Sequence, residues 1–184
     1  LGDLMPFLAE YADNGFSVFT YDYHGYGTSG GRASESAAYM DIEAAWEYMR
    51  EELEIPAENI IILGRSVGTG PSLWLAERKD AAGVLLISPF ISAFRVVTHY
   101  PLLPFDKFNN LKRIRHINMP VMIVHGTEDM VVPFRHGEKL FERAVEPKYC
   151  RWLEAAGHNE YVMFGGEEYW EIMNEFAEIL RRQK

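Results

Sequence analysis

A run of apolar residues leads directly into a G-x-S-x-G motif in Asn59-Ile60-Ile61-Ile62-Leu63-Gly64-Arg65-Ser66-Val67-Gly68. The residues from Pro71 to Lys79 then have a helical pattern. The motif alone is weak evidence because Gly and Ser are common, but a serine between a strand and a helix is typical of a nucleophile elbow. An elbow would place the Ser66 hydroxyl at a helix N-terminus, whose partial positive charge favours a developing oxyanion. The alternative is an ordinary glycine-flanked helix cap.

Four more short apolar runs flank this motif and predict further strands. They are Gly15–Tyr21, Gly83–Ser88, Pro120–His125 and Lys148–Glu154. Amphipathic helical patterns separate or follow them, as in Ala38–Leu53 and in Glu167–Lys184. Strands that alternate with helices favour an α/β fold with a mostly parallel sheet flanked by helices.

Two loops after predicted strands carry the residues that a serine nucleophile needs. Asp129 follows the run that ends at His125, and His158 follows the run that ends at Glu154. The carboxyl ends of parallel strands meet at one edge of a sheet, so both residues are expected near Ser66. A serine needs a base within hydrogen-bond reach, and the base needs a carboxylate to fix its tautomer. Glu128 is the rival for the acid, and Ser29 and Ser88 are the next candidates for the nucleophile.

The segment from Pro89 to Met119 has no clear periodicity and is rich in aromatic residues. An irregular segment of this length is usually functional, and we expect a short lid-like insertion at about 89–119. A loop that merely packs on the core is the alternative. The residues expected to line the substrate pocket are Tyr23, His24, Arg65, Phe90 and Phe94.

Composition excludes several classes of protein. The chain has 184 residues, which suggests one domain over residues 1–184, and its net charge of −9 argues against nucleic acid or anionic membrane surfaces as partners. A single cysteine, Cys150, excludes an internal disulfide and a multi-cysteine zinc site. No apolar run is long enough to span a bilayer, and Leu1 opens no signal-peptide pattern. We therefore expect a cytoplasmic protein with no metal and no cofactor. For its assembly, both a monomer and a homo-oligomer stay open.

The remaining histidines show no metal-ligand spacing. They are His24, His99, His116, His125 and His136. Each is expected to be an ordinary core or surface residue, although His24 stands out because it follows a predicted strand.

Four motifs together resemble the α/β-hydrolase superfamily, and within it the bem46-like branch that includes the protein depalmitoylases. They are Tyr21–Gly30, Gly64–Gly70, His125–Pro133 and Gly157–Glu160, and they cover nearly the whole chain. The resemblance implies that Ser66 is the nucleophile, His158 the base and Asp129 its orienting acid. It also implies that the backbone N–H of Val67 is one oxyanion donor.

The chain departs from that family at its start. In the family, three strands and an HGN-type loop precede the first helix, and the loop supplies the second oxyanion donor. Leu1-Gly2-Asp3 matches the residues just after this loop, so we expect an N-terminally truncated domain whose second donor lies upstream of Leu1. The third family strand would lie between Gly15–Tyr21 and Asn59–Gly64. Either the chain is a fragment, or these two strands pair directly in a reduced sheet.

The resulting functional prediction is a serine hydrolase of carboxylic esters or thioesters that works through an acyl-enzyme, with a small-molecule acyl substrate. One alternative is a catalytically impaired binding protein, and another is an amidase or a peptidase of the oligopeptidase type. Gly25–Gly30 also matches the dinucleotide fingerprint G-x-G-x-x-G. That interpretation is weak because three residues separate the predicted strand from the first glycine, and because no acidic residue at a strand end follows about 20 residues later.

Overall fold

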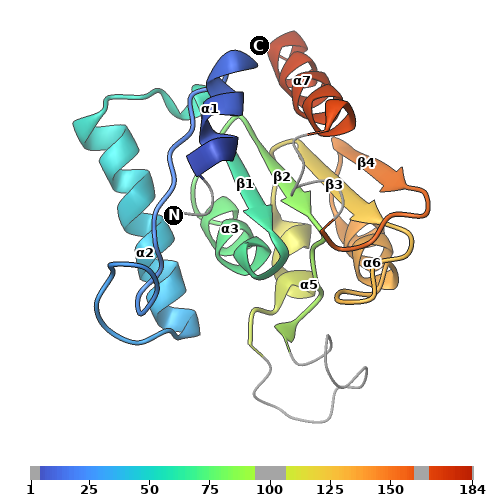
Figure 1. Ribbon diagram of the computed structural model, residues 1–184, viewed down its shortest axis with the longest axis horizontal. Coiled ribbons are helices and arrows are strands. Elements are labelled where there is room, and N and C mark those ends of the chain that lie inside the picture. The colour runs from blue at the N-terminus through green and yellow to red at the C-terminus, as the bar shows by residue number, and fades with distance from the viewer. Residues whose placement is uncertain (1–4, 94–106, 160–165, 184) are drawn as a thin grey trace.

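A parallel sheet of four strands forms the centre of the computed structural model, which describes residues 5–93, 107–159 and 166–183 (Figure 1). The strands are β1 (Ile61–Arg65), β2 (Gly83–Ile87), β3 (Val121–Gly126) and β4 (Lys148–Leu153). They stand in the order β1-β2-β3-β4, and every pair is parallel. All four carboxyl ends therefore lie at one edge of the sheet.

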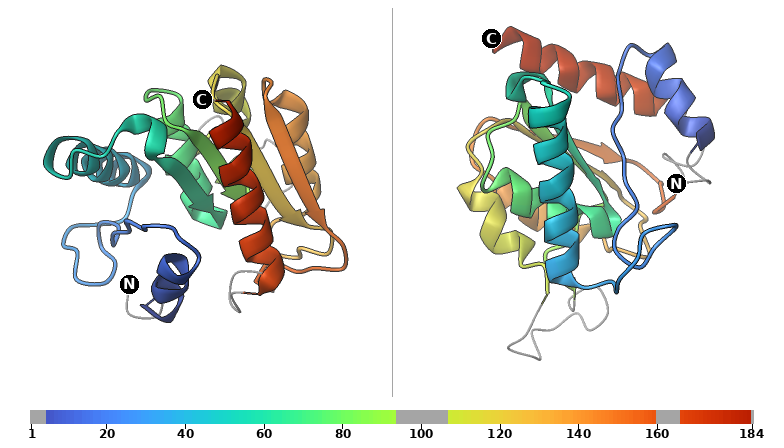
Figure 2. Two further views of the ribbon diagram at one scale, coloured as in Figure 1. Left: turned by 90° about the horizontal axis from the view of Figure 1, so that it is seen from above. Right: turned by 90° about the vertical axis from the view of Figure 1, so that its left-hand side faces the viewer.

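Helices cover both faces of this sheet (Figure 2). They are α1 (Met5–Asp13), α2 (Glu35–Glu47), α3 (Thr69–Ala76), α5 (Asn110–Arg113), α6 (Arg135–Arg143) and α7 (Glu167–Arg182). On one face α3, α5 and α6 pack on the strands, and α2 lies beside α3 beyond β1. α7 packs on the other face. The fold is thus the predicted α/β arrangement.

The apolar runs of the central strands follow from this layering. In β2, Val84 and Leu86 belong to the core formed with α2, α3 and α6, whereas Leu85 and Ile87 pack against α7. Successive side chains of a strand point to opposite faces, so a strand covered on both sides must be apolar at every position. β2 is buried along its whole length, and this explains why its sequence is apolar throughout.

The last helix follows its sequence pattern closely. α7 has Glu167 and Glu168 in its first turn and Arg181 and Arg182 in its last, so both ends suit the helix dipole. Its buried face includes Tyr169, Ile172, Met173, Phe176 and Leu180, which agrees with the amphipathic pattern predicted over Glu167–Lys184. This face holds the helix against the sheet.

The prediction of a strand over Gly15–Tyr21 is wrong for the described structure. The segment after Phe16 is extended, but it forms no ladder, and β1 pairs with β2 alone. The proposed direct pairing of these two segments is therefore also wrong. A strand requires a neighbour for its N–H and C=O groups, and the sequence pattern shows only that the side chains suit a sheet. Without that neighbour, Val18 and Phe19 are about two-fifths exposed.

The predicted irregular segment 89–119 is partly helical. Its described part contains α5 and a 3-10 turn over Ile114–His116, and Ile114 and Ile117 are buried in the core. Residues 94–106 lie outside the described structure, so the lid-like insertion stays a prediction, as does the single domain.

Candidate active site

Ser66 occupies a sharp turn between β1 and α3. Its φ angle is +48°, a left-handed conformation that L-residues rarely adopt, and a 3-10 turn over Ser66–Gly68 leads into α3. The turn needs small neighbours. A Cβ on Gly64 would lie 2.6 Å from Ser72 Oγ and 2.9 Å from the carbonyl oxygen of Gly68. The strained serine between a strand and a helix has the geometry of a nucleophile elbow.

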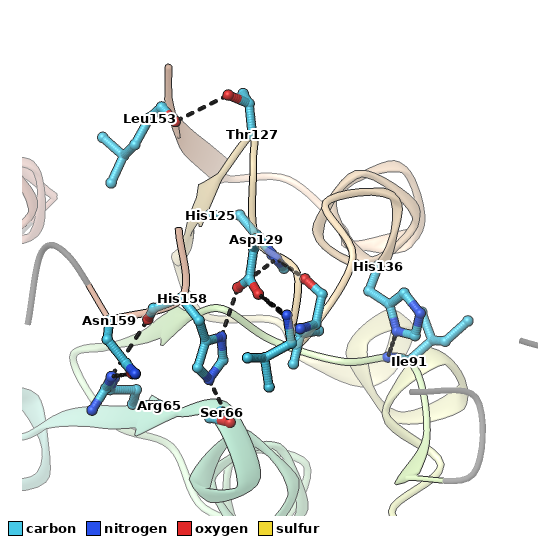
Figure 3. A network of polar contacts seen from close by, with 12 residues as sticks. Arg65, Ser66, Ile91, His125, Thr127, Asp129, His136, Leu153, His158 and Asn159 are labelled. Carbon is cyan, nitrogen blue, oxygen red and sulfur yellow. Dashed lines mark hydrogen bonds and ion pairs between the residues drawn. The ribbon is translucent and has the colours of Figure 1, made fainter. Parts of the chain in front are cut away.

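The structure brings together the three residues singled out as a triad (Figure 3). The Ser66 Oγ atom lies 3.1 Å from Nε2 of His158. On the other side of the ring, Nδ1 of His158 lies 2.7 Å from Oδ2 of Asp129. Ser66 follows β1, Asp129 follows β3 and His158 follows β4, so all three lie at the carboxyl edge of the sheet.

Asp129 is buried, and both of its carboxylate oxygens have hydrogen-bond partners. Its Oδ1 atom accepts hydrogen bonds from the backbone N–H groups of Val131, at 2.9 Å, and Val132, at 2.7 Å. Burial raises the pKa of this carboxyl, but hydrogen bonds from His125, His158 and the Val132 backbone outweigh it and hold the pKa far below its usual range. Asp129 is therefore a carboxylate at neutral pH and fixes a proton on Nδ1 of His158. Glu128, the rival acid, makes no such contact with His158 among the described residues.

His125 is a member of the site that sequence reasoning missed. Its buried ring lies behind Asp129, with Nε2 2.8 Å from the carbonyl oxygen of Val132 and 3.5 Å from Oδ2 of Asp129. A carbonyl accepts only, so Nε2 carries a proton. Within the described structure, Nδ1 has no hydrogen-bond partner. The only signal in the sequence was the position of His125, four residues before Asp129 at the end of the same strand.

Arg65 does not line the pocket as predicted. Its Nη2 group lies 3.4 Å from the carbonyl oxygen of His158 and 2.6 Å from Oδ1 of Asn159. Burial lowers the pKa of its guanidinium. The side chain fastens the loop that carries His158 to the end of β1.

A cavity of about 360 Å³ lies beside the elbow. Tyr23 and His24 line it, and so does the side chain of Val67, which is 62% exposed. The role of Tyr23 and His24 in a substrate pocket stays a prediction. Phe90 does not line it: this residue is 3% exposed and packs behind Phe108, which does. Phe94 lies outside the described residues. The sequence missed the contribution of α2 to this cavity.

The oxyanion donors can be placed only in part. Val67 is the second residue of the 3-10 turn that begins at Ser66, and its role as an oxyanion donor stays a prediction. The second donor, expected upstream of Leu1, stays a prediction. Across residues 5–93, 107–159 and 166–183, no cluster of three His, Cys, Asp or Glu side chains suits a metal ion. In that same part of the chain, no helix combines the length and apolarity needed to cross a membrane.

Comparison with known proteins agrees with this geometry. The family model described as "Serine aminopeptidase, S33" matches residues 2–108, more than half of the chain. The chain belongs to this family of α/β-hydrolases. This α/β-hydrolase is 45% identical over 165 residues to the human "Alpha/beta hydrolase domain-containing protein 17B", and the match covers 88% of the chain but 56% of that protein. The chain thus spans little more than half the length of this relative.

Solved structures share the fold of this α/β-hydrolase at low identity. An esterase from Pyrococcus furiosus has a TM-score of 0.80 at 18% identity, covering 97% of this chain and 75% of its own. A monoacylglycerol lipase from Paleococcus ferrophilus has a TM-score of 0.72 at 21% identity, and the match covers 95% of this chain and 88% of the lipase chain. These likenesses establish the α/β-hydrolase fold.

Proposed function

We propose that the protein is a serine hydrolase that cleaves carboxylic esters or thioesters through a covalent acyl-enzyme. The observation that carries the proposal is the hydrogen-bonded line from Ser66 through His158 to Asp129 at a strained elbow. The membership of a hydrolase family supports it. Three residue types from three separate loops meet with both ring nitrogens of the histidine engaged, which is the arrangement that nucleophilic acyl transfer requires.

In the acylation half-reaction, Oγ of Ser66 attacks the acyl carbon while Nε2 of His158 takes its proton. The carbonyl oxygen gains negative charge, and the N–H of Val67 stabilises it. The bond between the acyl carbon and the leaving oxygen or sulfur then breaks, and His158 gives the proton to that atom. Asp129 stabilises the imidazolium that forms in between.

In the deacylation half-reaction, a water molecule takes the place of the leaving group. His158 removes one proton from this water, whose oxygen attacks the acyl carbon. The bond to Oγ breaks, and His158 returns the proton to Ser66. The products are a carboxylic acid and the free enzyme, and these proton transfers need no cofactor.

A peptidase or amidase is the second candidate, because the matching family is described by a serine aminopeptidase. The same residues would serve, but an amine leaves less readily than an alkoxide or a thiolate. Comparing p-nitrophenyl acetate with alanine p-nitroanilide separates the two. The comparison uses the acceleration of each reaction over its uncatalysed rate. A larger acceleration for the ester supports the proposal, and a larger acceleration for the anilide replaces it.

Covalent labelling tests the nucleophile directly. A fluorophosphonate probe, followed by peptide mass spectrometry, is expected to modify Ser66, and Ser66→Ala is expected to remove both labelling and ester hydrolysis. Loss of a triad member costs on the order of 10⁴- to 10⁶-fold in kcat. Ser29→Ala is the matched control, since the Ser29 hydroxyl is hydrogen-bonded to the backbone of Asp22. Labelling that persists in Ser66→Ala refutes the assignment of Ser66 and makes Ser29 or Ser88 the next candidate. An unlabelled parent protein instead favours an inactive binding protein.

A further inference from the structure

His125 is buried at the end of β3 although its ring carries two polar nitrogen atoms. The residue is 1% exposed. Nε2 donates a hydrogen bond to the carbonyl oxygen of Val132, whereas Nδ1 has no hydrogen-bond partner within residues 5–93, 107–159 and 166–183. A buried polar atom without a hydrogen bond costs free energy, so this histidine is an expensive residue in a strand that is otherwise apolar up to that point. The ring must therefore do something that an apolar side chain could not.

The hydrogen bond from His125 completes a set of contacts that encloses the carboxyl group of Asp129 (Figure 3). Oδ1 of Asp129 accepts from the backbone N–H groups of Val131 and Val132. The carbonyl group of Val132 accepts from Nε2 of His125 at 2.8 Å, and the same Nε2 lies 3.5 Å from Oδ2 of Asp129. The Val132 carbonyl is thus the main acceptor and the carboxylate the secondary one. The loop that directs Oδ2 at His158 is held from behind by His125.

Helix α6 holds the ring of His125 from the other side. A Cβ on Gly137 would lie 2.6 Å from Nδ1 and 3.0 Å from Cγ of this ring, so the helix can pass it only with a glycine. The ring of Phe134, the residue before α6, stands at 79° to the imidazole with the centroids 5.9 Å apart. Glycine inside a helix is less favourable than alanine. The imidazole packed against Gly137 explains why glycine is present there.

The charged and titratable side chains that act on Asp129 are His125, His158 and Arg65. Burial raises the pKa of the Asp129 carboxyl, but the hydrogen bonds from His125, from His158 and from the Val132 backbone outweigh burial and lower it. Arg65 acts on the same carboxylate through its charge. Without the N–H group of His125, more negative charge would remain on the carboxylate, which would then hold a proton on His158 more tightly.

We propose that His125 is a positioning residue for the triad: held by Gly137 of α6, it fixes the loop of Asp129 and, through it, the orientation and basicity of His158. The inference rests on the proposed hydrolase function and adds one residue and one helix to the parts on which the reaction depends. Because its side chain is fully buried, His125 meets no substrate and acts only through Asp129.

The test measures kcat, KM and the pH profile of kcat/KM with p-nitrophenyl acetate in the parent protein, His125→Leu and His125→Gln. In His125→Leu, kcat is expected to fall by about 10- to 100-fold at constant KM, because the base is misplaced. The acidic limb of the profile is expected to move to higher pH by about half to one pH unit, which is the equivalent of one lost hydrogen bond. His125→Gln keeps an N–H group near the position of Nε2 and is expected to reverse most of both changes.

Gly137→Ala tests the contact with α6 while His125 itself is unchanged. Alanine favours the helix, but its Cβ displaces the imidazole, so kcat is expected to fall by about tenfold with a shift of the acidic limb in the same direction. Gly166→Ala is the matched control, because nothing lies within 4 Å of the added Cβ at that position. This control is expected to keep the kcat of the parent protein.

The outcomes separate this inference from the proposed function. If the parent protein hydrolyses the ester and a folded His125→Leu keeps the parent kcat and profile, the positioning role is overturned and the hydrolase proposal stands. A lower kcat with an unmoved acidic limb and no recovery in His125→Gln also overturns it, because His125 then serves stability alone. If His125→Leu does not fold, an unchanged kcat in Gly137→Ala overturns it. A parent protein that does not hydrolyse the ester overturns both proposals.

Discussion

Arg65 binds the loop of His158: its Nη2 group lies 3.4 Å from the His158 carbonyl oxygen. Arg65 is the last residue of β1, and Ser66 follows it directly. The guanidinium thus connects the strand that leads into Ser66 to the loop that carries His158. The connection is short and involves the two segments whose relative position determines the distance between Oγ and Nε2.

Arg65→Met is therefore expected to lower kcat for an ester substrate by about 10- to 100-fold, because a misplacement of about 1 Å costs on that order. Stopped-flow measurement of the acylation burst reports the step that needs His158. Arg78→Met, which removes an exposed guanidinium two residues after the C-terminal end of α3, is the control. Equal effects of the two changes would show that Arg65 acts only through general stability.

The backbone strain at Ser66 predicts a difference between two inactive variants. At φ +48°, alanine keeps the Cβ that disfavours a left-handed residue, whereas glycine removes it. Ser66→Gly is expected to be more stable than Ser66→Ala by about 1 kcal/mol, measured by urea unfolding. Equal stability would mean that the elbow is relaxed in solution.

The neighbouring acids predict opposite outcomes for two conservative changes. Asp129→Asn is expected to reduce kcat by about 10⁴-fold, because an amide no longer holds His158 in the tautomer that leaves Nε2 as acceptor. Glu128→Gln is expected to change kcat by less than about threefold. Steady-state kinetics of the two purified variants decides the matter, and a reversal of these effects would assign the acid to Glu128.

The low pKa of Asp129 predicts the pH dependence of stability. In the folded protein the pKa of the Asp129 carboxyl lies well below the unfolded value of about 3.9. The carboxylate therefore contributes its full stabilisation at pH values above about 3.9 and loses it as the pH falls below that value. The free energy of unfolding is therefore expected to fall more steeply between about pH 4 and pH 2 in the parent protein than in Asp129→Asn. Parallel curves would contradict the assignment of Asp129 as a strongly stabilised carboxylate.

The hydrogen bond from His125 to the Val132 carbonyl predicts different effects for His125→Gln and His125→Asn. The side-chain nitrogen of Gln reaches about the position of Nε2, which donates to Val132, whereas that of Asn reaches only the position of Nδ1. His125→Gln is expected to retain most of the activity, and His125→Asn to lose about 1–3 kcal/mol of stability through the unsatisfied carbonyl, with a lower kcat. Thermal unfolding and kinetics of both variants test this. If His125→Asn kept more stability and activity than His125→Gln, the assignment of Nε2 as the donor to Val132 would be wrong.

The sequence predicted those features that depend on local pattern. β2 and β3 were recognisable because strands covered on both faces are apolar throughout, and the triad loops followed from the strand ends and their order. The extended segment after Phe16 was mispredicted because a strand is a property of a pair, and its own side chains say nothing about a neighbour. Arg65 and Phe90 were placed in the wrong surroundings because the direction of a side chain depends on packing between distant segments. The catalytic roles, the cytoplasmic location and the oligomeric state stay predictions.

The order of the described sheet has a mechanical consequence for the site. Asp129 follows β3, which is held by strands on both sides, whereas Ser66 and His158 follow β1 and β4, the two outermost strands. Ser66 and His158 are thus carried by opposite margins of the described sheet. Any twisting or bending of the sheet alters the separation of its margins more than that of adjacent strands. The 3.1 Å separation of Oγ and Nε2 therefore depends on the relative position of β1 and β4 across the two strands that lie between them.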